Sequence, residues 1–249
     1  RARLSGGDDD VPEHPDLRAA EWEIFTVQSP PDPQDDFTIT RPGVPPELGG
    51  LLADVVQAER LREVRALVGF TRLDAPDPEE PDLVEVAPLA KASPTFVPAT
   101  EVRGEGIFLR LPEDLLRDWE QRVVGTVALK AHAEAYGRFR ENRYSGRIKG
   151  PSDLMKNWPG PRYIALHTLS HLLIRTIALE CGYSAASLSE RIYSGTADDP
   201  RSGILISTAV PDAEGTLGGL VSLGEPRELT RLFRRALTEA RRCSSDPLC

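Results

Sequence analysis

Two cysteines near the end of the sequence have a spacing that can bind a metal ion. Cys243 and Cys249 follow directly on a predicted helix. Two thiolates on one turn can ligate a single zinc ion, but zinc normally takes four ligands. The pair is therefore half a zinc site at best, and Cys181, a histidine or cysteines beyond Cys249 would have to complete it. The alternative is that both cysteines are unpaired thiols.

A pair of histidines is the second candidate for metal chemistry. His167 and His171 are four residues apart in a predicted helix, so both side chains point to one face, and Arg175 lies four residues further along that face. The zinc-protease pattern His-Glu-x-x-His is absent, because Thr168 stands where the catalytic glutamate would be. The interpretation that we favour is that these histidines hydrogen-bond to a neighbouring element instead of binding a metal.

A glycine-rich stretch from Glu214 to Gly219 follows a predicted strand, as phosphate-binding loops do. It lacks the Lys-Ser/Thr ending of a P-loop and the spacing of a dinucleotide-binding fingerprint, so nucleotide binding is not expected. Asp212 and Glu214 are candidate cation ligands, although two carboxylates on a loop are usually just solvated. Combined with His167 and His171, they define an alternative function, that of a metal-dependent hydrolase or nuclease.

Basic residues outnumber acidic ones by nine to three between positions 130 and 175, although the whole chain has a net charge of −9. A locally basic stretch can contact phosphates. The other interpretations are a solvated helix face, or a patch that docks on the acidic first hundred residues. The candidate nucleic-acid contacts are Arg138, Arg140, Arg143, Arg147 and Lys149.

The first hundred residues predict few regular elements that could position these groups. Residues 1–46 are rich in Asp, Pro and Gly and predict loop or an extended arm, apart from the apolar residues 22–25 and a possible strand over 37–40. Apolar residues at three- and four-residue spacing predict an amphipathic helix from residue 47 that turns into a strand near residues 67–70. Prolines and charges predict a surface loop over 74–81.

The remainder of the chain alternates helices and strands. Short strands are predicted over 83–86 and 106–111, and one long helix follows Pro112. Residues 162–181 predict a helix that is apolar on nearly all faces and therefore central to the core, with Gly182 as its C-cap. A short helix over 187–193, a strand over 203–209 and a last helix over 226–242 complete the pattern.

This order of elements predicts an α+β fold and not a regular βαβ array. We expect a helical core with a small mixed or antiparallel sheet and an extended, loop-rich N-terminal region. The expected domains are residues 1–100, with one amphipathic helix and short strands, and residues 101–249.

Composition excludes several classes of protein. With 40% hydrophobic and 28% charged residues among 249, the chain has neither a disordered nor a collagen-like composition, and its three cysteines are too few for a disulfide scaffold. The apolar runs are far shorter than the ~20 residues of a membrane span, so no membrane partner is expected. The odd cysteine count and the absence of a visible secretion signal predict a cytoplasmic protein. The acidic excess argues against a stand-alone, high-affinity DNA-binding protein.

Several motifs, taken in order, resemble the DrmB family of the DISARM anti-phage defence system. This family carries the zinc-binding helicase-associated domain that is also found in MrfA-type DNA-repair helicases. The matching motifs span roughly residues 101–249 and comprise residues 101–109, 167–173, 182–188, 190–193, 203–206, 211–221 and 243–249.

The resemblance implies a non-enzymatic subunit that pairs with a separate DNA helicase subunit, DrmA, and engages phage DNA within that complex. The family's zinc site uses four cysteines, and Cys243 and Cys249 fall on the first two. The second pair is then expected beyond Cys249. Cys181 matches no family ligand, and we expect it to be a buried thiol.

Overall fold

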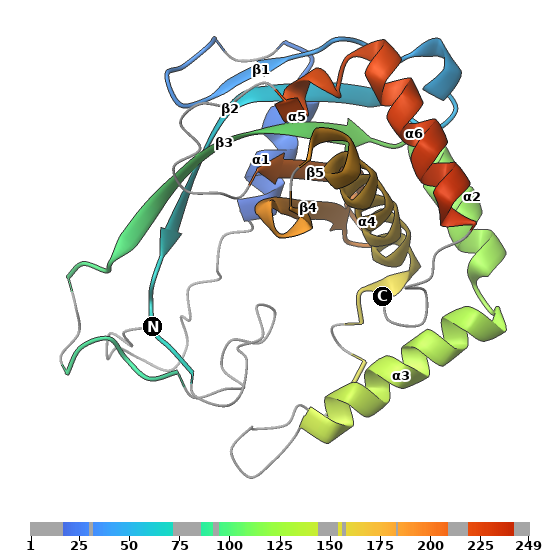
Figure 1. The fold of residues 1–249 in the computed structure, drawn as a ribbon. Coiled ribbons are helices and arrows are strands. Elements are labelled where there is room, and N and C mark those ends of the chain that lie inside the picture. Colours follow the sequence, from blue (N-terminus) through green and yellow to red (C-terminus); the bar gives the residue numbers. More distant parts are fainter. Residues whose placement is uncertain are drawn as a thin grey trace. The chain divides into compact units, whose positions relative to one another are not determined.

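The computed structural model describes residues 17–29, 32–71, 86–91, 95–143, 154–155, 158–182, 184–208 and 219–241 (Figure 1). The chain divides into two compact units. The described parts of 64–100 and 123–159 belong to the first unit, and those of 16–63, 101–122 and 160–249 belong to the second. The units interleave along the sequence, and the domain boundary expected at residue 100 stays a prediction.

Five described strands form one sheet in the order β1-β2-β3-β5-β4. The pairs β1/β2, β3/β5 and β4/β5 are antiparallel. Backbone hydrogen bonds join Ala53 N to Arg110 O and Leu67 N to Pro98 O, so β2 and β3 also run in opposite directions. The strands are β1 (Thr38–Thr40), β2 (Asp54–Ala66), β3 (Ala99–Arg110), β4 (Leu188–Gly195) and β5 (Pro200–Thr208).

The described helices differ in length and in the faces they bury. In α4, Leu166, Leu173 and Ile177 recur at helical spacing and are at most 1% exposed. Each such side chain contributes roughly 1.5–3 kcal/mol when fully buried. The helices are α1 (Leu17–Thr26), α2 (Glu113–Val123), α3 (Val127–Arg143), α4 (Gly160–Cys181), α5 (Gly219–Ser222) and α6 (Pro226–Ala240), with short 3-10 turns at Pro46–Leu48 and Ala185–Ser187.

Helices cover both faces of the sheet in the second unit, with α4 on one side and α1 on the other (Figure 1). Successive residues of a strand point to opposite faces. Ile204 and Ile206 of β5 therefore join the core beneath α4 and α6, whereas Leu205 joins a smaller aromatic cluster with α1. In that cluster, the ring of Phe25 stacks on Phe108 with centroids 4.9 Å apart.

Two predicted helices prove to be strands. Residues 54–66 form β2, and residues 188–195 form β4 instead of the short helix expected over 187–193. Both segments contain residues that a helix tolerates, so their local pattern was ambiguous. Pairing with neighbouring strands of the sheet determines the outcome: Ile39 of β1 pairs with Ala58, and Ile204 of β5 pairs with Ile192.

The long helix predicted after Pro112 is two helices. Gly125, with a φ of 85°, lies between α2 and α3 in a conformation that favours glycine. The apolar residues of this segment, among them Leu116, Val127 and Phe139, predict one buried face. Leu116 is buried, but Val127 is 84% and Phe139 is 57% exposed, so the prediction is wrong for α3. The N-terminal region is more regular than expected, since α1 packs Trp22 and Phe25 against the sheet.

The α+β fold class is confirmed, as is the helix over 162–181, and the strand predicted over 203–209 is confirmed as far as residue 208, where this described range ends. The last helix is confirmed over Pro226–Ala240, and Gly182 follows α4 with a φ of 69°, as expected of a C-cap. One face of α4 is less buried than predicted, because Leu179 is 60% exposed. The loop expected over 74–81 lies outside the described residues. No helix in the described part of the chain combines the length and the apolar character needed to cross a membrane.

Candidate metal centre and basic segment

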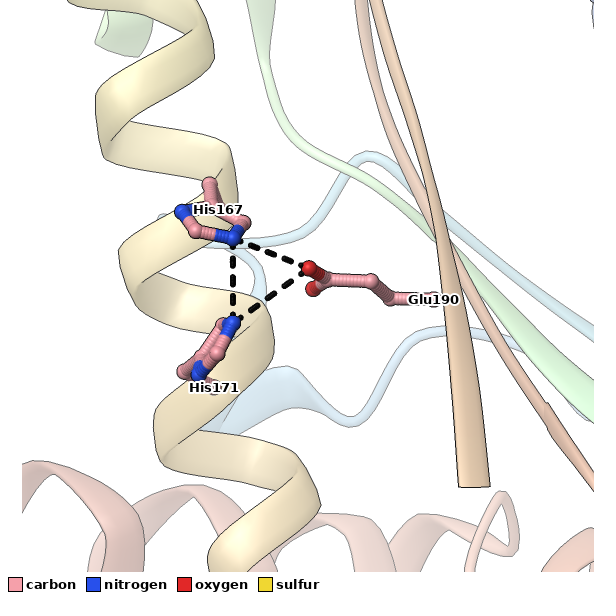
Figure 2. A group of neighbouring side chains, drawn as sticks. All are labelled: His167, His171 and Glu190. Atoms are coloured by element: carbon pink, nitrogen blue, oxygen red, sulfur yellow. Dashed lines mark hydrogen bonds and ion pairs between the residues drawn. The ribbon is translucent and has the colours of Figure 1, made fainter. Parts of the chain in front are cut away.

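His167, His171 and Glu190 come together between α4 and β4 (Figure 2). Nε2 of His167 lies 3.0 Å from Nε2 of His171 and 3.0 Å from Oε1 of Glu190. Nε2 of His171 lies 3.4 Å from the same carboxylate oxygen. Among the described residues, these three side chains therefore place their potential ligand atoms within 4.8 Å of one another.

The local structure of each element explains this convergence. A four-residue separation in α4 puts both histidines on one side of the helix. In β4, Glu190 alternates with Leu188 and Ile192, which both belong to the core beneath α4. Because side chains two residues apart in a strand share a face, Glu190 points toward α4 as well.

Neighbouring side chains hold the group in a half-exposed position. The ring of Tyr163, one turn earlier in α4, stacks on His167 with centroids 5.5 Å apart and planes inclined by 21°. The side chains of His167, His171 and Glu190 are 39%, 52% and 21% exposed. Ser170, between the histidines, is fully buried. Its Oγ and Oε2 of Glu190 are both buried without a hydrogen bond of standard geometry.

The carboxylate and the imidazole perturb one another electrostatically. The hydrogen bond to Glu190 raises the pKa of His167 above its ordinary value, against the opposing effect of burial. Burial by itself would raise the pKa of Glu190. Interactions with His167 and with the nearby hydroxyl of Ser170 outweigh that effect and lower the pKa of Glu190.

Two imidazoles and one carboxylate are a ligand set found in zinc proteins. A depression lined by Tyr163, Glu190, Ile192 and three charged residues adjoins the group. Thr168 occupies the position next to His167 at which zinc proteases carry a general base. The arrangement can therefore hold a cation, but α4 carries no carboxylate at the position next to His167 from which a general base would activate water.

Glu190 is the functional candidate that the sequence prediction missed. The alternative hydrolase hypothesis combines the histidines with Asp212 and Glu214, and both of these residues lie outside the described part of the chain. The expectation that the histidines contact a neighbouring element agrees with the contacts to β4. Reading residues 188–192 as a strand would have placed Glu190 on the core-facing side with Leu188 and Ile192.

The predicted cysteine ligands are not described. Cys243 and Cys249 lie outside the described residues, as does the side chain of Cys181. Their role as ligands stays a prediction.

The basic segment is described only in part. Arg138 on α3 is 65% exposed and lies 4.0 Å from Glu134. Arg140 is 1% exposed, so its guanidinium is not on the surface where a phosphate contact was expected. The side chain of Arg143 and the whole of Arg147 and Lys149 lie outside the described residues.

A comparison with family models identifies the class of domain at the end of the chain. Residues 169–249 match the model of the MrfA Zn-binding domain. The match includes α4 from Leu169, the sheet strands β4 and β5, and α6. Its description indicates zinc as the metal, in agreement with the expected cofactor.

The chain is also related to a curated protein. It is 32% identical over 239 residues to the DISARM protein DrmB of Bacillus paralicheniformis. The alignment covers 95% of this chain and 41% of that protein, so the chain spans about two fifths of the length of its relative. The resemblance expected from the motifs is confirmed, and it extends into the first hundred residues, where the motifs had indicated none.

Proposed function

We propose that this chain acts in a DISARM-like bacterial anti-phage defence complex as a non-catalytic, helicase-associated subunit. It binds a DNA helicase subunit, contributes to DNA engagement in the cytoplasm, and holds a structural zinc ion through Cys243, Cys249 and two further ligands. The observation that carries this proposal is the 32% identity to DrmB over 95% of the chain.

Exposed apolar side chains support the binding of a protein partner. Large apolar residues of the first unit that are exposed include Phe96 at 80%, Val127 at 84% and Phe139 at 57%. Among the described residues, fourteen large hydrophobic side chains are exposed, and ten of them belong to that unit. Single exposed apolar residues are ordinary, but their concentration in one part of a molecule is typical of an interaction surface.

Co-expression of the full-length protein with its helicase subunit, followed by size-exclusion chromatography, tests the proposal. A stable one-to-one complex is expected. Elution of a folded chain without the helicase would contradict the proposed role.

A matched pair of variants locates the contact. The double change Val127→Asp and Phe139→Asp places charges at exposed positions of the first unit, and we expect it to weaken the complex about tenfold or more. Leu179→Asp alters an equally exposed apolar residue of α4 in the second unit and should leave the complex intact. Equal weakening by both changes would show that the first unit does not carry the contact.

A second candidate function, that of a metal-dependent hydrolase or nuclease, is favoured by one observation. Glu190 joins His167 and His171 in a three-ligand group. Cleavage of DNA in the presence of Zn²⁺ or Mn²⁺ that is lost in His171→Ala would support this function. Absence of cleavage with every divalent metal would exclude it.

A further inference from the structure

We infer that His167, His171 and Glu190 form a zinc site that is separate from the cysteine pair. The site takes two imidazole nitrogens and one carboxylate oxygen, and it leaves a fourth position for water. This inference does not depend on the proposed defence role, and it holds whether or not the metal supports catalysis.

The distances within the group fit a tetrahedral ion. Zinc binds histidine nitrogen and carboxylate oxygen at about 2.0–2.2 Å, and a tetrahedral arrangement then separates any two ligand atoms by about 3.3 Å. The three separations in the structure are 3.0, 3.0 and 3.4 Å. The group therefore matches one face of a zinc coordination tetrahedron.

Hydrogen bonding alone does not account for all three contacts. A bond between the two Nε2 atoms requires that one ring carries a proton there and the other does not. If both histidines donate to Glu190, both Nε2 atoms must carry protons, and the contact between the rings is then repulsive. At most two contacts can be hydrogen bonds at one time, whereas one cation accepts a lone pair from every ligand.

The surroundings resemble those of other metal ligands. Carboxylates that bind metals usually accept a hydrogen bond on the oxygen turned away from the ion. Here Oε2 of Glu190 and the hydroxyl of Ser170 are both buried without a hydrogen-bond partner, and Ser170 lies on α4 between the two histidines. A hydrogen bond from Ser170 to Oε2 in the metal-bound state would orient Oε1 toward the ion. The partial exposure of both histidines leaves room for a water ligand.

Metal binding by a variant that lacks the cysteine pair tests the inference. In Cys243→Ser/Cys249→Ser, we expect one equivalent of Zn²⁺ by elemental analysis. Bound Co²⁺ should give visible ligand-field bands without the near-ultraviolet absorption of thiolate ligands. Adding His171→Ala or Glu190→Gln should weaken Zn²⁺ binding about 100-fold or more.

A third histidine provides the matched control. His132 on α3 is exposed, and its ring accepts a hydrogen bond from Trp158. Because His132 is not part of the three-residue group, His132→Ala should leave the metal content unchanged. If the cysteine variant does not fold, the same changes are made in the unsubstituted protein, where His171→Ala should remove one equivalent of Co²⁺ and spare the thiolate absorption. Equal metal content and equal spectra in His171→Ala, Glu190→Gln and His132→Ala would overturn the inference.

Discussion

Aromatic rings from several elements crowd around Gly203 in β5. A Cβ atom at this position would lie 2.6 Å from Cζ3 of Trp22 and 2.8 Å from Cε2 of Phe108. Real Cβ atoms do not approach other atoms so closely, and both rings are packed in the cluster between α1 and the sheet. The absence of a side chain at Gly203 is thus what allows α1 to lie against this face.

We therefore predict that Gly203→Ala lowers the free energy of unfolding by about 1–3 kcal/mol, because the rings must move out of their packed positions. Urea denaturation measures this change. Gly50→Ala is the matched control, since a Cβ there meets nothing within 4 Å, and it should change stability by no more than about 0.5 kcal/mol. Equal losses in both variants would contradict the packing argument.

Among the elements, α4 and α6 pack on the same face of the sheet, and one carboxylate joins them. Glu180 near the end of α4 pairs with Arg231 and Arg235 of α6, and its side chain is 7% exposed. Burial would raise the pKa of Glu180, but the hydrogen bonds from both arginines outweigh burial and lower the pKa below its ordinary value of 4.5. The folded state therefore prefers the ionised carboxylate.

Because folding favours the ionised form of Glu180, this carboxylate should stabilise the protein at neutral pH and lose that effect in acid. A carboxyl group whose pKa is lowered by folding stabilises the protein above its unfolded pKa, and that contribution is lost as the pH falls through the folded pKa. We predict that Glu180→Gln is less stable than the unsubstituted protein at pH 7, and that the difference shrinks as the pH falls below 4.5. Chemical denaturation across this range measures it. A difference independent of pH would show that the charge of Glu180 is not responsible.

At the scale of the whole molecule, charge is divided unevenly along the chain. Residues 1–100 hold 9 basic and 20 acidic residues, whereas residues 101–249 hold 21 and 19. DNA engagement by such a chain would depend on local basic residues within a larger complex and not on net charge. Arg138 is the candidate contact whose exposed side chain the structure describes.

We predict that Arg138→Gln weakens DNA binding by the helicase complex at low salt. The slope of log affinity against log salt concentration should become shallower by about 0.9, which is the effect of losing one phosphate contact. Salt titration of the complex on a fluorescent duplex measures the slope. Arg227→Gln, at an exposed position of α6, is the control and should leave the slope unchanged. Identical slopes in all three proteins would exclude Arg138 as a contact.

Elements with a local sequence pattern could be predicted from the amino-acid sequence. The apolar repeat of α4 with Gly182 after it, the β-branched run of β5 and the stripe of α6 predicted their structures correctly, and the ordered motifs predicted the relation to DrmB. Four-residue spacing likewise placed His167 and His171 on one face. Each of these structural elements depends on residues that lie close together in the sequence.

Contacts between these elements are visible only in the three-dimensional structure. Residues 54–66 and 188–195 become strands because they pair with other strands, β2 with β1 and β3, and β4 with the adjacent β5, and such pairing leaves little trace in local propensity. The same pairing sets the face of β4 from which Glu190 reaches the histidines. The burial of Arg140 and the exposure of Val127 also could not be predicted from the sequence, because periodicity identifies an apolar helix face but not the element that covers it.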